Sequence, residues 1–509
     1  MITQAGYAPL FLLVADIVRY ARAETIPVST RGSVANSLVA YCVGITTVDP
    51  IEHDLLFERF LNPERTNPPD IDLDFCSVRR DEVIDYVRHT YGEDRVAMVA
   101  TVSTMQPRSA VGETAKAYGL PEEEAKTLVK LLPDHWHPDP RRRVNSDLAT
   151  ILEKIADPRH REIVAAAYGI IGQPHHLSIH PGGLVVTPGP LTDVAPVQWT
   201  PKGLLITQFD HNEVEAIGLP KVDLLGIRAL TVLAETARLV RQHADPDFQL
   251  DGIPLDDPST AALLAEGDTV GVFQCESTGS RRTLRQLNVT TVQDLAVANA
   301  FFKPGPATGG MATNFIRRYR GEEAVTYLHP ALAPILCATK GVLLFQEQVL
   351  RVATVLAGLS WLEADSLRRG MSKFQPEAME QMRTRFVDGC QRPAPIGPAF
   401  TLEQATTLWE QVRAFAGYGF NQGHATAYAD VSYRSAWLKA HYPAEFLTAR
   451  LANYGGFHHP AIYLAEAQRL GIGVRPPHIN HSRRHFSLAL VGEEGDAPLL
   501  WMGLSQVRS

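Results

Sequence analysis

Apolar residues recur at helical spacing over residues 7–24, and this pattern predicts an amphipathic helix near the start of the chain. The apolar residues 26–28, followed by the glycine-containing segment 29–33, predict a strand and then a turn, with a second helix from Ala35. Prolines 68 and 69 precede residues 70–75, in which acidic and apolar residues alternate strictly. Because successive strand side chains point to opposite sides, this alternation predicts a β-strand with two unlike faces.

The rest of the pattern predicts a helical insertion within a sheet and then a long helical region. Helix formers dominate from 79 to 132, with an exposed loop at 133–143, and we expect a small helical lobe there. Short β-like runs return at 184–186, 204–206 and Val222, which predicts that the sheet is completed after the insertion. After Leu224 the chain is mainly helical through Leu451. A chain of 509 residues is too long for one ordinary core, so we expect a multidomain α+β protein.

Composition places the chain among globular proteins that stay in the cytoplasm. The hydrophobic fraction is 45% and the charged fraction 20%, as in soluble proteins. The apolar run at the N-terminus lacks a basic segment and is interrupted by Asp16 and Arg19, so neither a signal peptide nor a membrane span fits. Five cysteines lie far apart without a C-x-x-C pair, which disfavours disulfides and a structural zinc site and indicates reduced thiols.

The distribution of charge is more informative than its sum. A formal net charge of −8 argues against a nucleic-acid partner, but residues 279–320 hold seven basic side chains and one acidic one, a local balance of +6. Such a segment can neutralise phosphates, although a solvated helix face is an equally simple interpretation. The residues of this segment that we expect to bind DNA are Arg281, Arg282, Arg285, Arg317 and Arg318.

The acidic strand is the main candidate for chemistry. Asp70, Asp72 and Asp74 share one face, and neighbouring carboxylates repel each other unless cations lie between them. Two divalent ions about 3.5–4 Å apart can activate an attacking hydroxyl and hold a triphosphate. A calcium loop is disfavoured because Phe75 stands where that loop needs glycine. A solvated strand edge stays open as an alternative, and Asp70, beside Pro69, is the acid most typical of a strand start.

A further acid is expected from the returning part of the sheet. Asp223 lies on a short apolar run and is a candidate third ligand, with a helix cap as the alternative. Lys221 shares its face, so its ammonium group could contact phosphates, or it could be an ordinary strand-edge lysine. His175, His176 and His180 suggest zinc, but the neighbouring prolines and glycines break a helix, and we favour a loop near the substrate.

Several ordered motifs resemble the C-family polymerases, the catalytic alpha subunits of bacterial DNA polymerase III. They cover nearly the whole chain and comprise RGSVANSLVAY at 31–41, DLLFERFLNPER at 54–65, PPDIDLDF at 68–75, KVDLLGIRAL at 221–230, FQCES at 273–277, FFKPGP at 301–306, LFQEQ at 344–348, LRRGMSK at 367–373 and GYGFNQGHATAYA at 417–429.

The resemblance implies a palm with a nucleotidyltransferase-type, polymerase beta-like mixed sheet. Its catalytic acids and metal ligands would be Asp72, Asp74 and Asp223, holding two Mg²⁺ ions, with Mn²⁺ as a substitute; Asp70 is not one of the family's three. The implied domains are a palm at 1–105 and 173–231, a thumb at 106–172, fingers at 232–452, and at 453–509 the end of the fingers leading toward a truncated helix-hairpin-helix region.

The resemblance also implies a set of nucleotide-binding residues. A glycine-serine turn would face the incoming triphosphate, where glycine permits close backbone approach. Lys303 stands where the family's R-P-G-P element has arginine, so the charge is kept and the bidentate fork is lost. The implied residues are Arg31, Gly32, Ser33, Lys221, Lys303, Arg368, Arg369, Lys373, Tyr418 and His424.

The implied function is template-directed DNA synthesis from deoxynucleoside triphosphates on a primer-template, in replication or in error-prone repair of DNA damage. RGSVANS at 31–37 and QPRSAV at 106–111 resemble the error-prone branch, whereas GYGFNQGHATAYA and LKAHYPAEF at 438–446 resemble the replicase. The alternatives are a weak or inactive DNA-binding fragment without the clamp-binding and phosphoesterase-like domains, and a nucleotidyltransferase acting on RNA or small molecules. A sliding clamp and damage-response accessory proteins would bind through regions that we expect to lie outside this chain.

Overall fold

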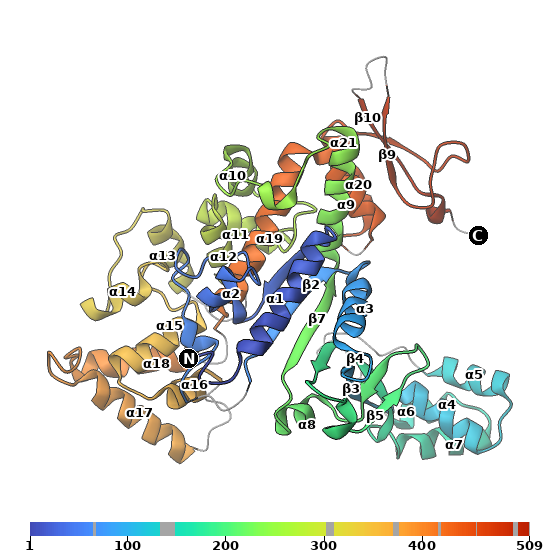
Figure 1. The fold of residues 1–509 in the computed structure, drawn as a ribbon, viewed down its shortest axis with the longest axis horizontal. Helices are drawn as coiled ribbons and strands as arrows, with labels where there is room; N and C mark the ends of the chain where they lie inside the picture. The colour runs from blue at the N-terminus through green and yellow to red at the C-terminus, as the bar shows by residue number, and fades with distance from the viewer. Residues whose placement is uncertain are drawn as a thin grey trace. The chain divides into compact units, whose positions relative to one another are not determined.

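The computed structural model describes residues 1–64, 68–132, 148–301, 310–369, 376–415, 419–454, 456–491 and 497–507. The chain forms two compact units, Met1–Glu93 with Gly218–Ser509, and Asp94–Ile217 (Figure 1). The first unit therefore contains segments from both ends of the chain, and the second is an insertion.

The first unit contains a mixed three-stranded arrangement of β1 (Val28–Arg31), β2 (Ile71–Cys76) and β7 (Lys221–Ile227). β1 pairs antiparallel with β2, and β2 pairs parallel with β7. The apolar residues of β2 are fully buried, as the alternation of residues 70–75 predicts. α9 (Arg228–His243) packs against β2, and α1 (Ala8–Ala23) packs against α3 (Arg80–Tyr91).

Hydrophobic cores join the described helices of the first unit. One core joins α10 (Pro258–Ala265), α11 (Thr278–Leu287), α12 (Val292–Phe301), α13 (Gly310–Tyr319) and α19 (Gln422–His441). A second joins α14 (Ala333–Leu336), α15 (Gln346–Arg351), α16 (Trp361–Arg369), α17 (Pro376–Cys390) and α18 (Leu402–Phe415). The third joins α9 to α20 (Pro443–Ala452), α21 (Pro460–Arg469) and the C-terminal strands.

α19 connects these helices to the sheet. It lies along α12 and packs against β1 (Figure 1). Its start is set by Asn421, whose side chain accepts a hydrogen bond from the backbone N–H of His424 at 2.7 Å, and Pro443 follows its end. Most of its residues are buried, so its position is determined on all sides by packing.

Near the C-terminus lies a second sheet of the first unit. β8 (Gly473–Arg475) pairs parallel with β10 (Ala497–Trp501), which pairs antiparallel with β9 (Ser487–Val491). Phe486 and Leu500 bury their side chains in the core of α9 and α20, which attaches this sheet to the helices.

The second unit combines strands with a helical cluster. β3 (Val96–Thr104) lies between β4 (Pro174–Val186), its antiparallel partner, and β6 (Leu205–Thr207), which in turn pairs with β5 (Val197–Trp199). The helices are α4 (Pro107–Ala117), α5 (Glu122–Leu131), α6 (Leu148–Glu153), α7 (Pro158–Tyr168) and α8 (His211–Ala216). The first four of these helices share one hydrophobic core.

Short helical turns complete the described structure. The 3-10 turns are η1 (Val34–Asn36), η2 (Phe57–Arg59), η4 (Leu191–Asp193), η5 (Leu250–Gly252), η6 (Pro330–Leu332) and η9 (Leu504–Gln506), η7 (Val352–Leu356) is one turn of π-helix, and α2 (Leu38–Cys42) is a short α-helix. No helix in the described part of the chain is long and apolar enough to cross a membrane.

The α+β class, the mixed sheet, the return of the chain to the sheet at β7 and the helical region after Leu224 are confirmed. The structure corrects three local predictions. Residues 96–104, expected in a helical lobe, form β3, because the run VAMVATVST is rich in β-branched residues that suit a strand. His175, His176 and His180 lie on β4 and not on a loop. The first strand, β1, includes Ser29, Thr30 and Arg31, which were expected in the turn.

Candidate functional site

Two acids from distant parts of the chain face each other in the first unit. Asp72 on β2 is directly opposite Asp223 on β7 in the parallel pair. Asp70, one residue before β2, joins them, and one carboxylate oxygen from each of the three lies within 4.8 Å of the others. Asp223 is buried, Asp72 half-buried and Asp70 exposed, so the group opens to solvent on one side. Among the described residues, this is the group of acids, histidines or cysteines arranged to hold a metal ion.

Electrostatics favour a cation at this group. Burial, then the negative charges of Asp70 and Asp223, raise the pKa of Asp72 to about 8. Lys221 forms an ion pair with Asp223 and lies 3.9 Å from Asp70. Burial alone would lower the pKa of Lys221, but its carboxylate neighbours raise it overall. Three hard oxygen donors that repel one another are a donor set that fits Mg²⁺ or Mn²⁺.

Asp74 has a different environment from the other acids. It lies two residues after Asp72 on β2, its side chain is fully buried, and it is not one of the three acids gathered within 4.8 Å. Arg31 Nε donates to its Oδ2 at 3.0 Å, a second guanidinium nitrogen pairs with Oδ1, and the hydroxyl of Tyr428 donates at 3.1 Å. Burial raises the pKa of Asp74 overall, against the opposing effect of Arg31. Of the three predicted acids, the structure therefore brings Asp72 and Asp223 together and joins Asp74 to Arg31.

The turn after β1 lies beside these acids. Gly32 has φ +71°, a conformation that suits glycine, and a Cβ there would lie 3.5 Å from Asp72 Oδ2. Its N–H donates to His424 Nδ1 at 3.4 Å. Ser33, half-buried, begins η1 without a side-chain cap. The resemblance placed Arg31, Gly32, Ser33 and His424 around one nucleotide, and the structure brings these four residues into one region.

The N-terminal part of α19 completes this region. The rings of His424 and Tyr428, one helical turn apart, have centroids 4.2 Å apart. The guanidinium carbon of Arg31 lies 5.8 Å from the centroid of the Tyr428 ring. The sequence analysis missed Tyr428. Its signal was available, since it belongs to the GYGFNQGHATAYA motif four residues after His424.

Glu347 of the LFQEQ motif was also missed. Its side chain is 1% exposed, and Oε2 accepts a hydrogen bond from the backbone N–H of Gln422 at 2.8 Å. Burial raises the pKa of this carboxyl. Glu347 therefore holds the first residue of α19 and contributes to the placement of His424 and Tyr428.

The predicted basic residues have varied environments. Arg368 on α16 donates to Asp365 at 2.8 Å and to Gln346 at 3.2 Å, so part of its guanidinium is engaged within the protein. The side chain of Arg369, and all of Lys303, Lys373 and Tyr418, lie outside the described residues.

The predicted DNA-binding arginines do not form one uniform surface. Arg281 donates to the carbonyl of Gly267 at 2.8 Å, while Arg282 and Arg285 are exposed on α11. Arg318 pairs with Glu323 at 3.1 Å, and Arg317 approaches the same carboxylate at 3.8 Å. The count of charges ended at residue 320, and Glu322 and Glu323 follow directly, so the basic excess is locally offset.

Two models of protein families match this chain, and together they cover residues before and after Asp223. A family model described as the bacterial DNA polymerase III alpha NTPase domain matches residues 1–226, and one described as the finger domain of the same subunit matches residues 229–393. The first match includes Asp72 and Asp223, and the second includes the helices that follow them.

Curated relatives agree with these matches. DNA polymerase III subunit alpha of Thermus aquaticus is 41% identical over 521 residues, covering 100% of this chain and 41% of the relative. The same subunit of Aquifex aeolicus is 36% identical over 512 residues, covering 96% and 44%. An error-prone DNA polymerase of Symbiobacterium thermophilum is 40% identical over 498 residues, also covering 96% and 44%. The chain spans less than half the length of these relatives.

Proposed function

Because the chain belongs to the family of bacterial DNA polymerase III alpha subunits, we propose that it catalyses template-directed addition of deoxynucleotides to a primer 3′-hydroxyl. The observation that carries this proposal is the pairing of Asp72 with Asp223 across β2 and β7, with Asp70 beside them. An open group of three carboxylates suits nucleotidyl transfer, because that reaction depends on positioning and on neutralising phosphate charge.

The acids would hold two Mg²⁺ ions, which Mn²⁺ could replace. When bound, such ions supply Lewis-acid stabilisation of the phosphate oxygens and acidify the attacking hydroxyl. Asp72 and Asp223 are the central ligands in this proposal, with Asp74 as the third acid of the family. Arg31 orients Asp74 through two hydrogen bonds, and Lys221 supplies positive charge beside Asp223.

The incoming triphosphate is proposed to bind along the turn after β1. Gly32 leaves space for close backbone approach, and Arg31, Lys221 and His424 surround the turn and the acids with groups able to donate to phosphate oxygens. We assign residues 1–105 and 173–231 to the palm, 106–172 to the thumb and 232–452 to the fingers. Most contacts to DNA are expected on its backbone, so sequence preference should be slight.

Primer extension tests the proposal directly. Purified Asp72→Asn and Asp223→Asn variants should each lose at least about 100-fold in extension rate with Mg²⁺, because each removes a ligand charge at the reacting phosphate. Asp81→Asn, an exposed acid on α3 with the same charge change, should retain activity. Extension by Asp72→Asn at the parent rate, or no extension by the parent with either ion, would disprove the proposal.

Two further points need separate assays. Untemplated primers should not be extended, and extension of them would favour a nucleotidyltransferase acting without a template. The alternative, DNA binding without effective synthesis, predicts retained binding and no extension.

A relative named DNA polymerase III subunit alpha and one named error-prone DNA polymerase are about equally similar to the chain, so we propose a role in replication or in lesion bypass. Clamp and accessory proteins would be partners of the longer relatives' additional regions.

A further inference from the structure

A basic groove lies in the first unit among α9, α20 and the segment that leads into β9. Its volume is about 340 Å³. Arg238 lies on α9, and Arg483, Arg484 and His485 line the groove from the other side. None of these residues belongs to the carboxylate site or to the residues that the sequence analysis assigned to DNA.

The segment on one side of the groove has an unusual charge distribution. Residues 467–491 contain four arginines, three histidines and no aspartate or glutamate, while Glu466 precedes them and Glu493, Glu494 and Asp496 follow. Arg483 and Arg484 are exposed and form no ion pair with any described residue, unlike Arg317 and Arg318, which pair with Glu323. The acidic residue among the described residues that line the groove is Glu235, and it pairs with Arg238 at 2.7 Å. Within the described part of the chain, these two exposed arginines therefore present positive charge that no ion pair offsets.

The backbone that carries these arginines is fixed. The N–H of Leu504 donates to the carbonyl of Arg483 at 2.9 Å, and the N–H of Ser505 donates to that of Arg484 at 3.0 Å. Phe486, 6% exposed, anchors the segment in the core shared with α9 and α20. A ligand that binds here orders only side chains, so little of the binding free energy is lost in ordering the backbone.

Neutral hydrogen-bonding side chains complete the groove. Gln242, Thr448, Asn453 and Ser487 line it beside the arginines. Arginine together with such amide and hydroxyl groups is the set of donors that proteins use on DNA phosphates. A protein-binding surface would instead need an exposed apolar centre, and the phenylalanine of this lining is buried.

We propose that this groove binds the phosphodiester backbone of DNA, with Arg483 and Arg484 as its principal contacts. The choice of DNA as the polyanion rests on the proposed function. Binding at this groove would add contacts to the template strand or the duplex away from the primer 3′ end. These contacts would not depend on base sequence.

Equilibrium binding measured by fluorescence anisotropy tests the inference without chemistry. The 509-residue chain is titrated onto a labelled 20-nucleotide single strand and onto a labelled 20-base-pair duplex, in EDTA and without nucleotides, from 50 to 200 mM NaCl. Arg483→Gln with Arg484→Gln should raise Kd about tenfold at 100 mM salt and lower the slope of log Kd against log salt by about 2, one unit for each lost phosphate contact. The DNA form with the larger change identifies the strand state that occupies the groove.

A matched variant controls for net charge. Arg383→Gln with Arg413→Gln removes the same two charges from exposed arginines of α17 and α18 that pair with Glu380 and Glu410, and it should change Kd less than twofold. Equal weakening in both double variants, or parent-like binding by the Arg483 and Arg484 variant, overturns the inference.

If the parent extends primers while that variant binds normally, only the groove assignment fails. If the parent does not extend primers but the variant binds weakly, the groove assignment stands and the proposed function fails.

Discussion

Asp74 is fully buried in β2, yet its carboxylate is stabilised by Arg31 and Tyr428. These contacts offset only part of the cost of burying the charge, because burial still raises the pKa of Asp74 overall. Asp72 has like-charged neighbours instead, and its pKa is raised to about 8. The two acids on this strand face therefore differ in their surroundings: Arg31 pairs with Asp74, whereas Asp72 lies beside Asp70 and Asp223.

The roles of Asp70 and Asp74 can be separated by substitution. Asp74→Asn should lower the primer-extension rate at least about 100-fold, because it removes a proposed ligand and leaves the half-buried guanidinium of Arg31 without its carboxylate partner. Asp70→Asn should lower it less than about tenfold, because Asp70 is exposed and its ion pair with Lys221 is long, at 3.9 Å. Rates are measured across a Mg²⁺ titration. A larger loss in Asp70→Asn than in Asp74→Asn would identify Asp70 as the third ligand.

At the scale of elements, α19 connects β1 and β2 to the helices. Gly423 lies where α19 meets η1, and an added Cβ would lie 2.1 Å from Asn36 Oδ1 and 3.2 Å from the carbonyl of Gly32. Asn36 is 1% exposed and donates to the carbonyl of Leu56 at 2.8 Å, so its side chain cannot move aside to make room for a Cβ atom. Glycine at this position is what allows His424 and Tyr428 to approach β1 and β2.

Gly423→Ala should therefore affect both stability and activity. We expect the free energy of unfolding to fall by about 1–3 kcal/mol from overpacking, and extension to fall at least about tenfold as α19 shifts away from Asp74. Urea unfolding and primer extension measure the two effects. Gly112→Ala in α4 is the control, since the nearest atom to its Cβ is a valine methyl at 3.8 Å. It should leave activity unchanged and raise stability by up to about 1 kcal/mol.

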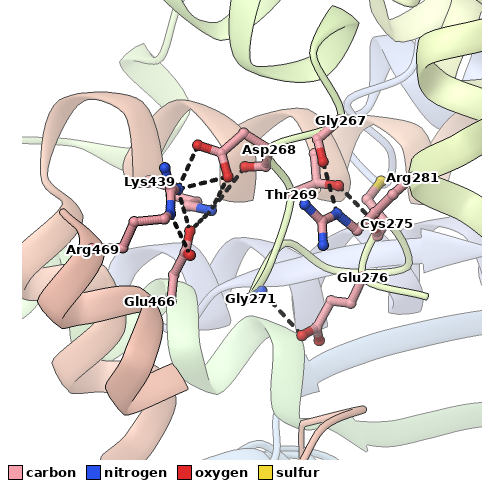
Figure 2. Close-up of polar contacts among 10 residues, drawn as sticks. All are labelled: Gly267, Asp268, Thr269, Gly271, Cys275, Glu276, Arg281, Lys439, Glu466 and Arg469. Atoms are coloured by element: carbon pink, nitrogen blue, oxygen red, sulfur yellow. Dashed lines mark hydrogen bonds and ion pairs between the residues drawn. The ribbon is translucent and has the colours of Figure 1, made fainter. Parts of the chain in front are cut away.

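A second junction between elements is the loop at residues 267–276, which follows α10. Figure 2 shows Asp268 of this loop beside Lys439 of α19 and Glu466 and Arg469 of α21. Lys439, 2% exposed, donates to Glu466 at 2.6 Å and to the carbonyl of Asp268 at 2.8 Å. Arg469 pairs with both acids. This network fixes the loop to two helices that lie far from it in sequence.

The network predicts a pH-dependent contribution to stability. Burial opposes ionisation of Glu466, but Arg469 and Lys439 outweigh it and lower its pKa from 4.5 to about 2. Its stabilisation should thus be complete above pH 4.5 and be lost as pH falls toward 2. Glu466→Gln should lower the free energy of unfolding by about 3 kcal/mol at pH 7, because Lys439 stays buried.

Urea unfolding of parent and Glu466→Gln at pH 7 and pH 3 checks this. The difference between them should be smaller at pH 3 by on the order of 2 kcal/mol. Glu410→Gln breaks an exposed pair with Arg413 and should change stability by less than about 0.5 kcal/mol at both pH values. A pH-independent difference for Glu466→Gln would show that the network contributes packing and not charge.

The sequence predicted those elements whose pattern is local. Alternation over residues 70–75 was sufficient to identify β2, and the helical spacing of residues 7–24 identified α1. β3 was missed because its nine residues, eight of them apolar or β-branched, lie between segments of helix formers, and the surrounding composition outweighed the local run. The sheet of β8, β9 and β10 was missed because its strands are only three to five residues long.

The part of the site that depends on residue types and sequence motifs could be predicted. The strand pattern and the resemblance together identified Asp72 and Asp223, and their pairing in register is observed. The contact of Tyr428 with Asp74 joins residues 354 positions apart and depends on how α19 packs, which no local pattern contains. For the same reason, charge counting did not distinguish Arg318, paired with Glu323, from Arg483, which is exposed.

At the scale of the whole molecule, the carboxylate site belongs to one unit assembled from both ends of the chain. Asp72 precedes the inserted unit Asp94–Ile217, and Asp223 follows it. The inserted unit has its own hydrophobic core, in which Leu128 is 1% exposed. The first unit has separate cores, in one of which Leu438 is fully buried. We therefore expect a substitution in one core to destabilise its own unit more than the other.

Hydrogen exchange followed by mass spectrometry tests this division. Leu128→Ala should destabilise its unit by about 2–5 kcal/mol and raise exchange in α4 and α7 at least about tenfold, with α9 and α19 unchanged. Leu438→Ala should show the reverse pattern. Because Asp72 and Asp223 lie in the first unit, Leu438→Ala should also weaken Mg²⁺-dependent extension more than Leu128→Ala does at low temperature. Equal acceleration of exchange in both units by either variant would mean that the inserted unit unfolds together with the strands that hold the acids.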